Sequence, residues 1–503
     1  MAKICLSLTK KTLALDMEIL EKYRDYVDIA ELRVDCLDPD ERLLIRRFPE
    51  MAGIPVILSI RRSVDGGYFI SGEGARISLL AKGLAYAEAD RRLNFAYVDL
   101  EEDLHVPGLE EAARAFGTRI IRSWYNKEVV YDDFAEKIKN LRRIGDELVK
   151  ISMTPVSLED LINIYRIKEE TRGIEKIFHV KGEYGLSTGL LSDFFGSNIY
   201  YSSDETGQVD PKELTKLYRF HDINKDTKIF AAAGNSIIST ASVRFFNTVF
   251  GIEKTNAIFI HIPVDSLNSL LRLADETGIS GISLDAPFKE EILHYLPQKS
   301  KEVLAIGACN VITATPQGWT GYNTDAPAFS DSLLGFLGKK DLRRRKLTIA
   351  GSGNIARAVA AEVYRLKGKA LVLSRAAAQA RLLAEPYRFN WADSESRGMD
   401  FVRKYAGIII QAGSLGMESE DDHDPLEYYK FSGDEVIMGL TGESYSNRCL
   451  KRAEEAGCRI LNGHEMLHRQ VRYKYNYFMN KEFPPSLVSR VGFLESNDGS
   501  GKN

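Results

Sequence analysis

Residues 346–356 read KLTIAGSGNIA, a strand-like apolar run that ends in a glycine turn. A helix-like run follows the turn. A strand, the pattern Gly351-x-Gly353-x-x-Ala356 and a helix in this order are typical of dinucleotide-binding folds, in which the pyrophosphate lies at the helix N-terminus. We therefore expect Gly351, Gly353, Asn354 and Ala356 to contact a dinucleotide.

The next expected strand, Ala370–Leu373, is followed directly by Ser374 and Arg375. A site selective for NAD usually has an acidic residue here, which binds the ribose hydroxyls. A serine and an arginine instead favour the 2′-phosphate of NADP. Ser374 and Arg375 are therefore predicted to contact NADP.

An ordered series of short motifs precedes this turn: Gly234-Asn235 with Thr240-Ala241-Ser242, Pro287-Phe288-Lys289, Ala308-Cys309-Asn310 and Gly321-Tyr322-Asn323-Thr324-Asp325. Lys289 and Asp325 each lie at the end of an apolar segment and can share one proton in a pocket. Thr240 and Ser242 carry hydroxyls two residues apart, which can both donate to one carboxylate. A proton-handling pair beside a hydride carrier is what alcohol–ketone oxidoreduction requires.

The order and spacing of these motifs resemble shikimate dehydrogenase. The resemblance implies that Lys289 and Asp325 handle the proton of the reacting oxygen, and that Asn310 binds substrate. It also implies a substrate contact from Gln470, the last residue of the segment that begins at Gly463, with Gly463 itself at the cofactor.

Two positions in the segment before Lys289 depart from that family. Ser283 and Asp285 replace an asparagine and a threonine that contact substrate hydroxyls in the family. Asp285 adds an acceptor beside an anionic ligand, which could alter the preference among ring hydroxyls.

The first 205 residues show a regular recurrence of short apolar or β-branched runs: Lys3–Leu8, Ile29–Asp35, Val56–Arg61, Phe95–Glu101, Arg119–Tyr125, Glu147–Met153, Lys176–Lys181 and Asn198–Ser203. Helix-like segments such as Ser157–Glu169 separate most of them. Eight such units in this length predict a compact (β/α)8 barrel, whose catalytic groups lie at the C-terminal ends of its strands. So many charges at one end of the barrel suggest an anionic substrate. The polar residues at these strand ends are Glu31, Arg33, Arg61, Glu101, Tyr125, Lys150, His179 and Lys181.

Lys150 lies in an otherwise apolar run. A lysine there is costly unless it is paired or deprotonated. We expect burial to lower its pKa and to leave an amine able to form a Schiff base with a ketone.

The front half resembles type I 3-dehydroquinate dehydratase, a (β/α)8 barrel that works through a lysine imine. The matching segments are Glu31-Leu32-Arg33-Val34-Asp35, Arg61 followed by Asp65-Gly66-Gly67, Lys150-Ile151, Gly196-Ser197 and Gly207-Gln208. The resemblance implies that Lys150 forms the imine and that Glu31, Arg33, Arg61 and Gln208 contact substrate.

The dehydratase match also has departures. Tyr125 replaces the general acid/base histidine, and Gly189 replaces an arginine that binds the substrate carboxylate. Because side chains of a strand alternate, His179 and Lys181 share one face and could stand in for the two missing groups.

These observations predict an α/β chain in three parts: a barrel over residues 1–222, a shikimate dehydrogenase-like substrate domain over 227–335, and a Rossmann NADP-binding domain over 336–490 whose last helix returns to the substrate domain. The predicted function is a bifunctional enzyme that dehydrates 3-dehydroquinate and reduces 3-dehydroshikimate to shikimate with NADPH. Two alternatives stay open. The same folds could act on quinate or a related polyol acid, or they could form a non-catalytic sensor of such acids.

Composition agrees with a globular enzyme of 503 residues and 44% apolar content. A net charge of −4 gives no reason to expect nucleic acid or an anionic membrane as partner. The five cysteines are scattered, and no His/Cys/Asp spacing suggests a metal site. No apolar stretch reaches membrane-spanning length. Scattered cysteines in an odd number are typical of buried free thiols in a reducing cytosol, so we expect a cytoplasmic protein.

Overall fold

The computed structural model describes residues 1–85, 90–126, 133–204, 209–234, 239–395, 398–413, 424, 426–440 and 448–488. The chain forms two compact units, residues 1–279 and 280–503, and each is described by itself. The division falls inside the predicted substrate domain, and the predicted domain boundaries stay predictions.

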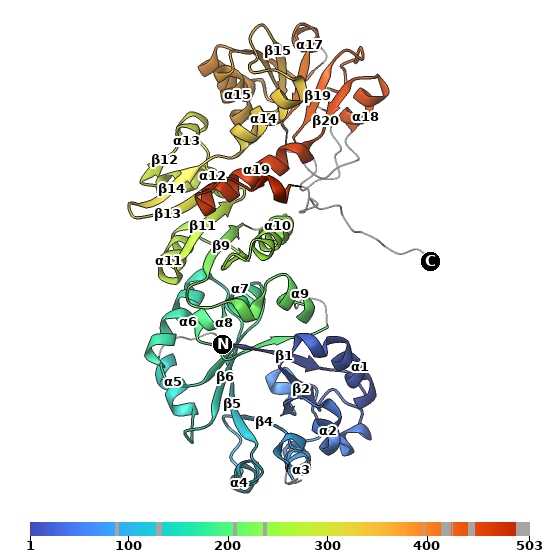
Figure 1. Cartoon of the computed structure of the whole chain (residues 1–503), viewed down its shortest axis with the longest axis vertical. Helices are drawn as coiled ribbons and strands as arrows, with labels where there is room; N and C mark the ends of the chain where they lie inside the picture. The colour runs from blue at the N-terminus through green and yellow to red at the C-terminus, as the bar shows by residue number, and fades with distance from the viewer. Residues whose placement is uncertain are drawn as a thin grey trace. The chain divides into compact units, whose positions relative to one another are not determined.

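The first unit begins with the predicted barrel (Figure 1). Eight strands form one sheet in the order β7-β6-β5-β4-β3-β2-β1-β8, and every pair is parallel. The strands are β1 (Lys3–Leu8), β2 (Ile29–Arg33), β3 (Val56–Ser59), β4 (Tyr97–Glu101), β5 (Arg119–Asn126), β6 (Leu148–Met153), β7 (Lys176–Val180) and β8 (Ile199–Ser202). Two hydrogen bonds link β7 to the residues that lead into β8. The Asn198 N–H donates to the Lys176 carbonyl at 2.8 Å, and the Phe178 N–H donates to Ser197 Oγ at 3.0 Å.

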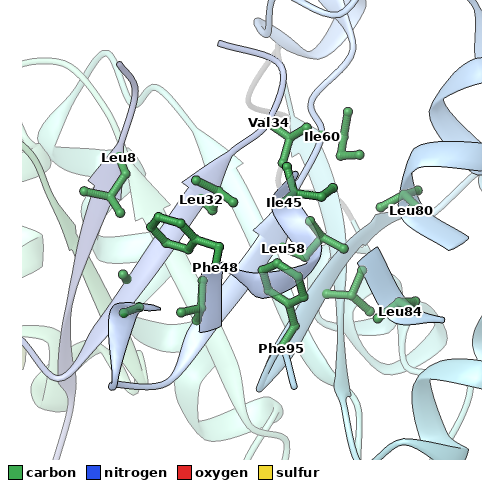
Figure 2. Packing of buried hydrophobic residues seen from close by; sticks show 14 of the residues in the cluster. Leu8, Leu32, Val34, Ile45, Phe48, Leu58, Ile60, Leu80, Leu84 and Phe95 are labelled. Carbon is green, nitrogen blue, oxygen red and sulfur yellow. The ribbon is translucent and has the colours of Figure 1, made fainter. Parts of the chain in front are cut away.

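Helices cover the outside of these strands: α1 (Leu13–Tyr23), α2 (Phe48–Ala52), α3 (Glu73–Leu84), α4 (Pro107–Ala115), α5 (Phe134–Leu141), α6 (Leu158–Glu170), α7 (Gly185–Leu190) and α8 (Ser192–Phe195). The helix predicted from Ser157 is present, and Ser157 and Asp160 form a capping box at its start. Figure 2 shows how Phe48 and Phe95 pack with leucines of the strands between the sheet and this outer layer. Burial of such apolar side chains is the main term that stabilises the barrel.

The inside of the barrel is layered. Each strand contributes to one apolar layer, which consists of Cys5, Ile29, Ile57, Tyr97, Ile121, Leu148, Ile177, Ile199 and Tyr201. Because successive side chains alternate between faces, residues two positions further along the strands also point inward. In β2, β4, β6 and β7 those residues are Glu31, Asp99, Lys150 and His179. The apolar layer therefore forms the floor beneath a polar site.

The rest of the first unit contains β9 (Lys228–Ala233) and β10 (Ala257–Ile262), which pair in parallel, together with α10 (Ser239–Ile252) and α11 (Leu267–Thr277). The second unit starts with a small sheet. There β11 (Ile279–Leu284) pairs antiparallel with β13 (Val311–Thr315), β13 pairs antiparallel with β14 (Gly318–Tyr322), and β12 (Gln298–Lys299) pairs with β14 in parallel. The helices of this part are α12 (Phe288–Glu291), α13 (Lys301–Ile306) and α14 (Asp325–Leu337).

A second, all-parallel sheet follows in the order β17-β16-β15-β18-β19-β20. Its strands are β15 (Lys346–Ala350), β16 (Lys369–Ser374), β17 (Asn390–Asp393), β18 (Ile408–Gln411), β19 (Val436–Gly439) and β20 (Arg459–Leu461). Its helices are α15 (Asn354–Arg365), α16 (Ala377–Ala384), α17 (Met399–Tyr405) and α18 (Arg448–Glu455), and α19 (Gly463–Met479) ends the described fold. This strand order is that of a Rossmann sheet, so the predicted fold class is confirmed. None of the helices in the described ranges is long and apolar enough to cross a membrane.

Candidate active sites

Lys150 is fully buried at the centre of the barrel. Its Nζ lies 2.8 Å from Oδ2 of Asp99 and 3.4 Å from Oε1 of Glu31. The ring of Tyr201 lies beneath it, with 4.4 Å between Nζ and the ring centroid. Asp99 was missed in the sequence, although a carboxylate inside the apolar strand Tyr97–Glu101 is a signal of the same kind as Lys150 itself.

The expected direction of the Lys150 pKa is wrong. Burial alone would lower the pKa of Lys150, but Asp99, Tyr201 and Glu31 offset that effect and hold the pKa well above its usual value. Burial would raise the pKa of Glu31, and Lys150 and Arg61 more than reverse this, so that its pKa lies well below the usual range. At neutral pH this part of the barrel therefore holds an ammonium between carboxylates.

Several buried polar atoms around this ammonium lack a hydrogen-bond partner within the described part of the chain. They are Oδ1 of Asp99, Oγ of Ser123, the hydroxyl of Tyr201 and Nε of Arg61. A buried polar group without a partner costs free energy of about 1–3 kcal/mol. Such unpartnered groups in the barrel suit a polar ligand that would supply the missing partners.

A cavity of about 200 Å³ opens above Glu31. It is lined by Ser7, Thr9, Glu31, Arg33, Arg61, His179, Lys181 and Ser203. Arg61 lies 3.6 Å from Glu31, while the guanidinium of Arg33 is held by both oxygens of Asp35, at 2.9 and 2.7 Å. Three basic side chains line this cavity, Arg33, Arg61 and Lys181, and they suit the anionic substrate that the sequence suggested.

His179 and Lys181 both reach this cavity, as the strand alternation predicted. Burial, followed by Lys150, Arg61 and Lys181, lowers the pKa of His179 well below its usual value, so the imidazole is neutral. Burial also lowers the pKa of Lys181, to about 8. Nδ1 of His179 lies 3.4 Å from Oγ of Ser152.

Tyr125 lies beside Arg61, with 5.3 Å between the guanidinium carbon and the ring centroid. Burial raises the pKa of Tyr125 to about 12, with a further contribution from Asp99. The phenol is therefore protonated and suited to donate a hydrogen bond rather than to accept a proton.

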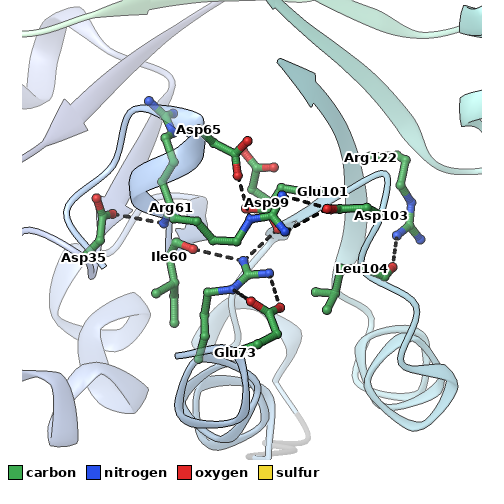
Figure 3. A network of polar contacts seen from close by, with 12 residues as sticks. Asp35, Ile60, Arg61, Asp65, Glu73, Asp99, Glu101, Asp103, Leu104 and Arg122 are labelled. Carbon is green, nitrogen blue, oxygen red and sulfur yellow. Dashed lines mark hydrogen bonds and ion pairs between the residues drawn. The ribbon is translucent and has the colours of Figure 1, made fainter. Parts of the chain in front are cut away.

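A layer of ion pairs supports the rim of the barrel (Figure 3). The fully buried Arg76 donates to the Ile60 carbonyl at 3.1 Å and to Glu101 at 2.7 Å. Arg62 contacts Asp103 through two hydrogen bonds of 2.9 Å. These contacts fix the ends of β3 and β4, so Glu101 is engaged outside the cavity.

Two further positions of the dehydratase resemblance are Gly189 and Gln208. Gly189 lies against Tyr200, and a Cβ at this residue would come within 1.9 Å of a carbon of that ring. No larger side chain fits there, so the arginine expected from the family has no equivalent at this position. Gln208 lies outside the described residues.

The second unit brings four predicted residues together. Oδ1 of Asp325 accepts from Nδ2 of Asn310 at 2.9 Å and from Nε2 of Gln470 at 2.8 Å. Its other oxygen, Oδ2, lies 3.9 Å from Nζ of Lys289. This separation is longer than a direct charge-assisted hydrogen bond, so the ammonium keeps donors for another oxygen.

Residues beside this cluster were not predicted. Nζ of Lys474, one turn after Gln470 in α19, donates to Oγ of Ser283 at 2.8 Å. Asn323 holds the start of α14, because its Oδ1 accepts from the N–H groups of Asp325 and Ala326. Asn323 was quoted within a motif but received no role, and Lys474 had no sequence signal apart from its spacing from Gln470.

The glycine turn fits a dinucleotide phosphate. Gly351 has φ +136°, and a Cβ there would lie 2.6 Å from the carbonyl carbon of Ala412, so only glycine is accommodated. Nothing lies within 4 Å of a Cβ built at Gly353, which precedes the N-terminus of α15. Asn354 is the first residue of that helix and Ala356 is fully buried against the sheet. Backbone N–H groups of this first turn are thus available to an anion.

Ser374 ends β16, and its hydroxyl lies 3.1 Å from that of Ser352 in the turn. Arg375 follows it and is exposed. Gly463 is the buried first residue of α19. Ser242 is half-buried in α10 of the first unit, and the side chain of Thr240 lies outside the described residues.

Comparisons with known proteins find relatives of both halves of the chain. Residues 4–225 match the family model of type I 3-dehydroquinase, and residues 232–312 match that of the shikimate dehydrogenase substrate binding domain. A bifunctional 3-dehydroquinate dehydratase/shikimate dehydrogenase from Arabidopsis thaliana is 23% identical over 493 residues, which cover 92% of this chain and 79% of that protein. A shikimate dehydrogenase (NADP(+)) from Caldanaerobacter subterraneus is 28% identical over 274 residues, covering 53% of this chain and 96% of the relative.

Among solved structures, a dehydroquinate dehydratase and shikimate dehydrogenase from S. pombe is 17% identical, covers 97% of this chain and 98% of its own, and has a TM-score of 0.44. The two family matches show that the chain joins a type I 3-dehydroquinase domain to a shikimate dehydrogenase substrate binding domain. It is an enzyme with the domain composition of a bifunctional shikimate-pathway protein.

Proposed function

We propose, from this pairing of a type I 3-dehydroquinase domain with a shikimate dehydrogenase domain, that the chain catalyses two consecutive reactions. The barrel dehydrates 3-dehydroquinate to 3-dehydroshikimate, and the second site reduces that ketone to shikimate with NADPH. The observation that carries the proposal is the hydrogen-bonded cluster of Asp325, Asn310 and Gln470 with Lys289 beside it. A sensor would not need a proton-sharing pair next to a dinucleotide fold.

In the reductase site, Lys289 and Asp325 act on the reacting oxygen. NADPH, when bound at the glycine turn, supplies the hydride. The ammonium of Lys289 donates a proton to the oxygen as negative charge develops on it, and Asp325 holds that ammonium in place. Asn310 and Gln470 fix Asp325 through its other oxygen, which keeps the carboxylate from turning away.

The cofactor preference rests on the end of β16. Arg375 can make charge-assisted bonds to a 2′-phosphate, and Ser374 stands where an acidic residue would repel it. The shikimate dehydrogenase relative from Caldanaerobacter is named for NADP(+), which supports the same choice. A preference for NAD in shikimate oxidation would overturn this part of the proposal.

In the barrel, Lys150 adds to the ketone carbon of 3-dehydroquinate and releases water as the imine forms. Because the resting amine is protonated, a proton must leave it first, and Asp99 at 2.8 Å is the nearest acceptor. Neutral His179 then removes the proton next to the imine carbon, and the resulting imidazolium gives a proton to the ring hydroxyl, which departs as water. Water then hydrolyses the imine, which releases the product and restores the Lys150 amine. Arg61 and Lys181 bind the substrate carboxylate in place of the residue lost at Gly189.

Both reactions can be tested with the full chain. Dehydration is followed by the absorbance of the conjugated product, and reduction by the oxidation of NADPH with 3-dehydroshikimate. We expect Lys150→Ala to abolish the first and Lys289→Ala the second, while each variant keeps the other activity as proof of folding. Turnover of quinate in place of shikimate would favour the alternative substrate.

A further inference from the structure

The hydroxyl of Tyr201 is a buried polar group with no part in the steps assigned to Lys150 and His179. Tyr201 lies on β8 and is 5% exposed. Its hydroxyl has no hydrogen-bond partner within the described ranges of the chain. A buried tyrosine hydroxyl usually has a partner, and one left unpaired lowers the stability of the fold. Residues that carry such a cost are expected at functional sites.

The Tyr201 ring lies close to both reacting groups of the barrel. Nζ of Lys150 is 4.4 Å from its centroid, and the centroid of the His179 ring is 5.0 Å away. Tyr201 belongs to the layer that forms the floor of the polar site, and Ser203, the first residue after β8, lines the cavity. The hydroxyl is therefore among the groups that would surround a ketone bound to Lys150.

This hydroxyl can donate a hydrogen bond but does not ionise. Burial raises the pKa of Tyr201 well above its usual value, Lys150 opposes this, and Glu31 adds to it. The phenol of Tyr125 is also protonated, but its ring lies beside the guanidinium of Arg61, whereas the ring of Tyr201 faces Nζ of Lys150. A protonated donor in a site shielded from water is suited to stabilise negative charge that develops on an oxygen.

We propose that Tyr201 donates a hydrogen bond to the ketone oxygen of the substrate while Lys150 adds to the ketone carbon. The bond between Nζ and this carbon forms as an electron pair of the C=O bond moves to the oxygen. The Tyr201 hydroxyl stabilises the negative charge that appears there. This inference deepens the proposed dehydratase function and rests on it.

Tyr201 keeps its proton throughout, and Asp99 moves the two protons that the ketone oxygen needs. Asp99 takes one from the resting ammonium before the addition and gives it to the oxygen afterwards. It then takes a second proton from the nitrogen of the adduct and gives it to the new hydroxyl, which leaves as water while the C=N bond forms. The protonated imine and the water together account for the three protons of the ammonium.

The test uses Tyr201→Phe in the full chain, which removes only the hydroxyl. Each protein is mixed with 3-dehydroquinate and quenched with borohydride at successive times, and the adduct at Lys150 is quantified by mass spectrometry. We expect the rate of adduct formation at saturating substrate to fall about a hundredfold, which is typical of one lost donor to a developing oxyanion. The substrate concentration at half-maximal rate should change less than about threefold, because the hydrogen bond strengthens only as charge develops.

Tyr200→Phe is the matched control. Tyr200 is the neighbouring tyrosine of β8, and its side chain projects from the other face of the strand, where its ring centroid is 5.9 Å from that of Phe220. This variant should form the adduct at the wild-type rate, and a loss as large as that of Tyr201→Phe would overturn the inference. The melting temperature of Tyr201→Phe should not fall, because no hydrogen bond within the described ranges is lost. A lower melting temperature with an unchanged rate of adduct formation would show a structural role and refute the catalytic one.

The same experiment separates this inference from the proposed function. An adduct that forms as fast in Tyr201→Phe as in wild type would remove Tyr201 from the mechanism and leave the dehydratase function in place. The absence of an adduct in wild type would overturn the dehydratase function, and the inference with it.

Discussion

Replacement of Lys289 by methionine tests the reductase mechanism most directly. The substitution removes the ammonium but keeps an unbranched side chain of similar length. In the structure, Nζ lies 3.9 Å from Oδ2 of Asp325, and both side chains are mostly buried, at 18% and 4% exposure. The proposed role predicts a loss in the chemical step, because the ammonium acts where charge develops on the substrate oxygen.

The expected size follows from the negative charge that Lys289 would face on the substrate oxygen. With an effective dielectric constant of about 20, an ammonium attracts a unit negative charge about 4 Å away by about 4 kcal/mol. A loss of that size in transition-state stabilisation corresponds to about a thousandfold in rate. We therefore expect kcat for 3-dehydroshikimate to fall about a thousandfold, within the range typical of a lost general acid.

The assay is steady-state NADPH oxidation, with NADPH affinity measured separately by fluorescence. Affinity for NADPH should stay within about twofold, because Lys289 is assigned to the substrate oxygen and not to the phosphates. Dehydration of 3-dehydroquinate by the same preparation shows that the barrel is folded, and the retained NADPH affinity shows that the second unit is folded. A Lys289→Met protein with kcat within about tenfold of wild type would refute the reasoning, since so small a loss is below the proposed general-acid contribution.

Four other results are expected. Borohydride reduction in the presence of 3-dehydroquinate should attach the substrate carbon skeleton to Lys150, as seen by mass spectrometry, and the absence of an adduct would show that the barrel is not a working dehydratase. Gly351→Ala should weaken NADPH binding at least about tenfold and lower the melting temperature, because its Cβ would lie 2.6 Å from the carbonyl carbon of Ala412. An unchanged dissociation constant for NADPH would contradict a role of this glycine turn in binding the cofactor. Arg375→Ala should lower kcat/KM for NADPH about tenfold and leave that for NADH nearly unchanged, whereas equal losses would remove Arg375 from 2′-phosphate recognition. The pKa of His179 lies well below its usual value, so its neutral base form should persist as the pH falls below the ordinary titration range of histidine. Dehydratase kcat/KM that falls within that ordinary range, in a way that His179→Ala abolishes, would count against His179 as the base.

The strands were readable from the sequence because their patterns are local. The runs at Lys3–Leu8 and Lys346–Ala350 coincide with β1 and β15. Others ended early: the run predicted to Asp35 stops as a strand at Arg33, where Asp35 turns back and binds the Arg33 guanidinium. Local alternation also placed His179 and Lys181 on one face correctly.

Side-chain partnerships between distant segments were not readable in the same way. Lys150 and Asp99 are separated by 51 residues, and only the closing of the barrel brings them together. The sequence showed that Lys150 would be buried, yet the direction of its pKa depends on which carboxylates face it. Lys474 is a similar case, because its partner Ser283 lies 191 residues away.

The charged state of Lys150 has a consequence for the order of events in the barrel. An ammonium cannot attack a ketone, so the raised pKa of Lys150 would stop imine formation unless substrate binding redistributes protons. Oδ1 of Asp99 has no partner among the described residues and can accept a hydrogen bond from the substrate while Oδ2 contacts Lys150. A substrate carboxylate that binds Arg61 also weakens the hold of Arg61 on Glu31, 3.6 Å away, and makes Glu31 a better proton acceptor. In the proposed mechanism, the amine of Lys150 therefore stays protonated until an anionic substrate enters the cavity, and binding of that substrate allows the proton to leave.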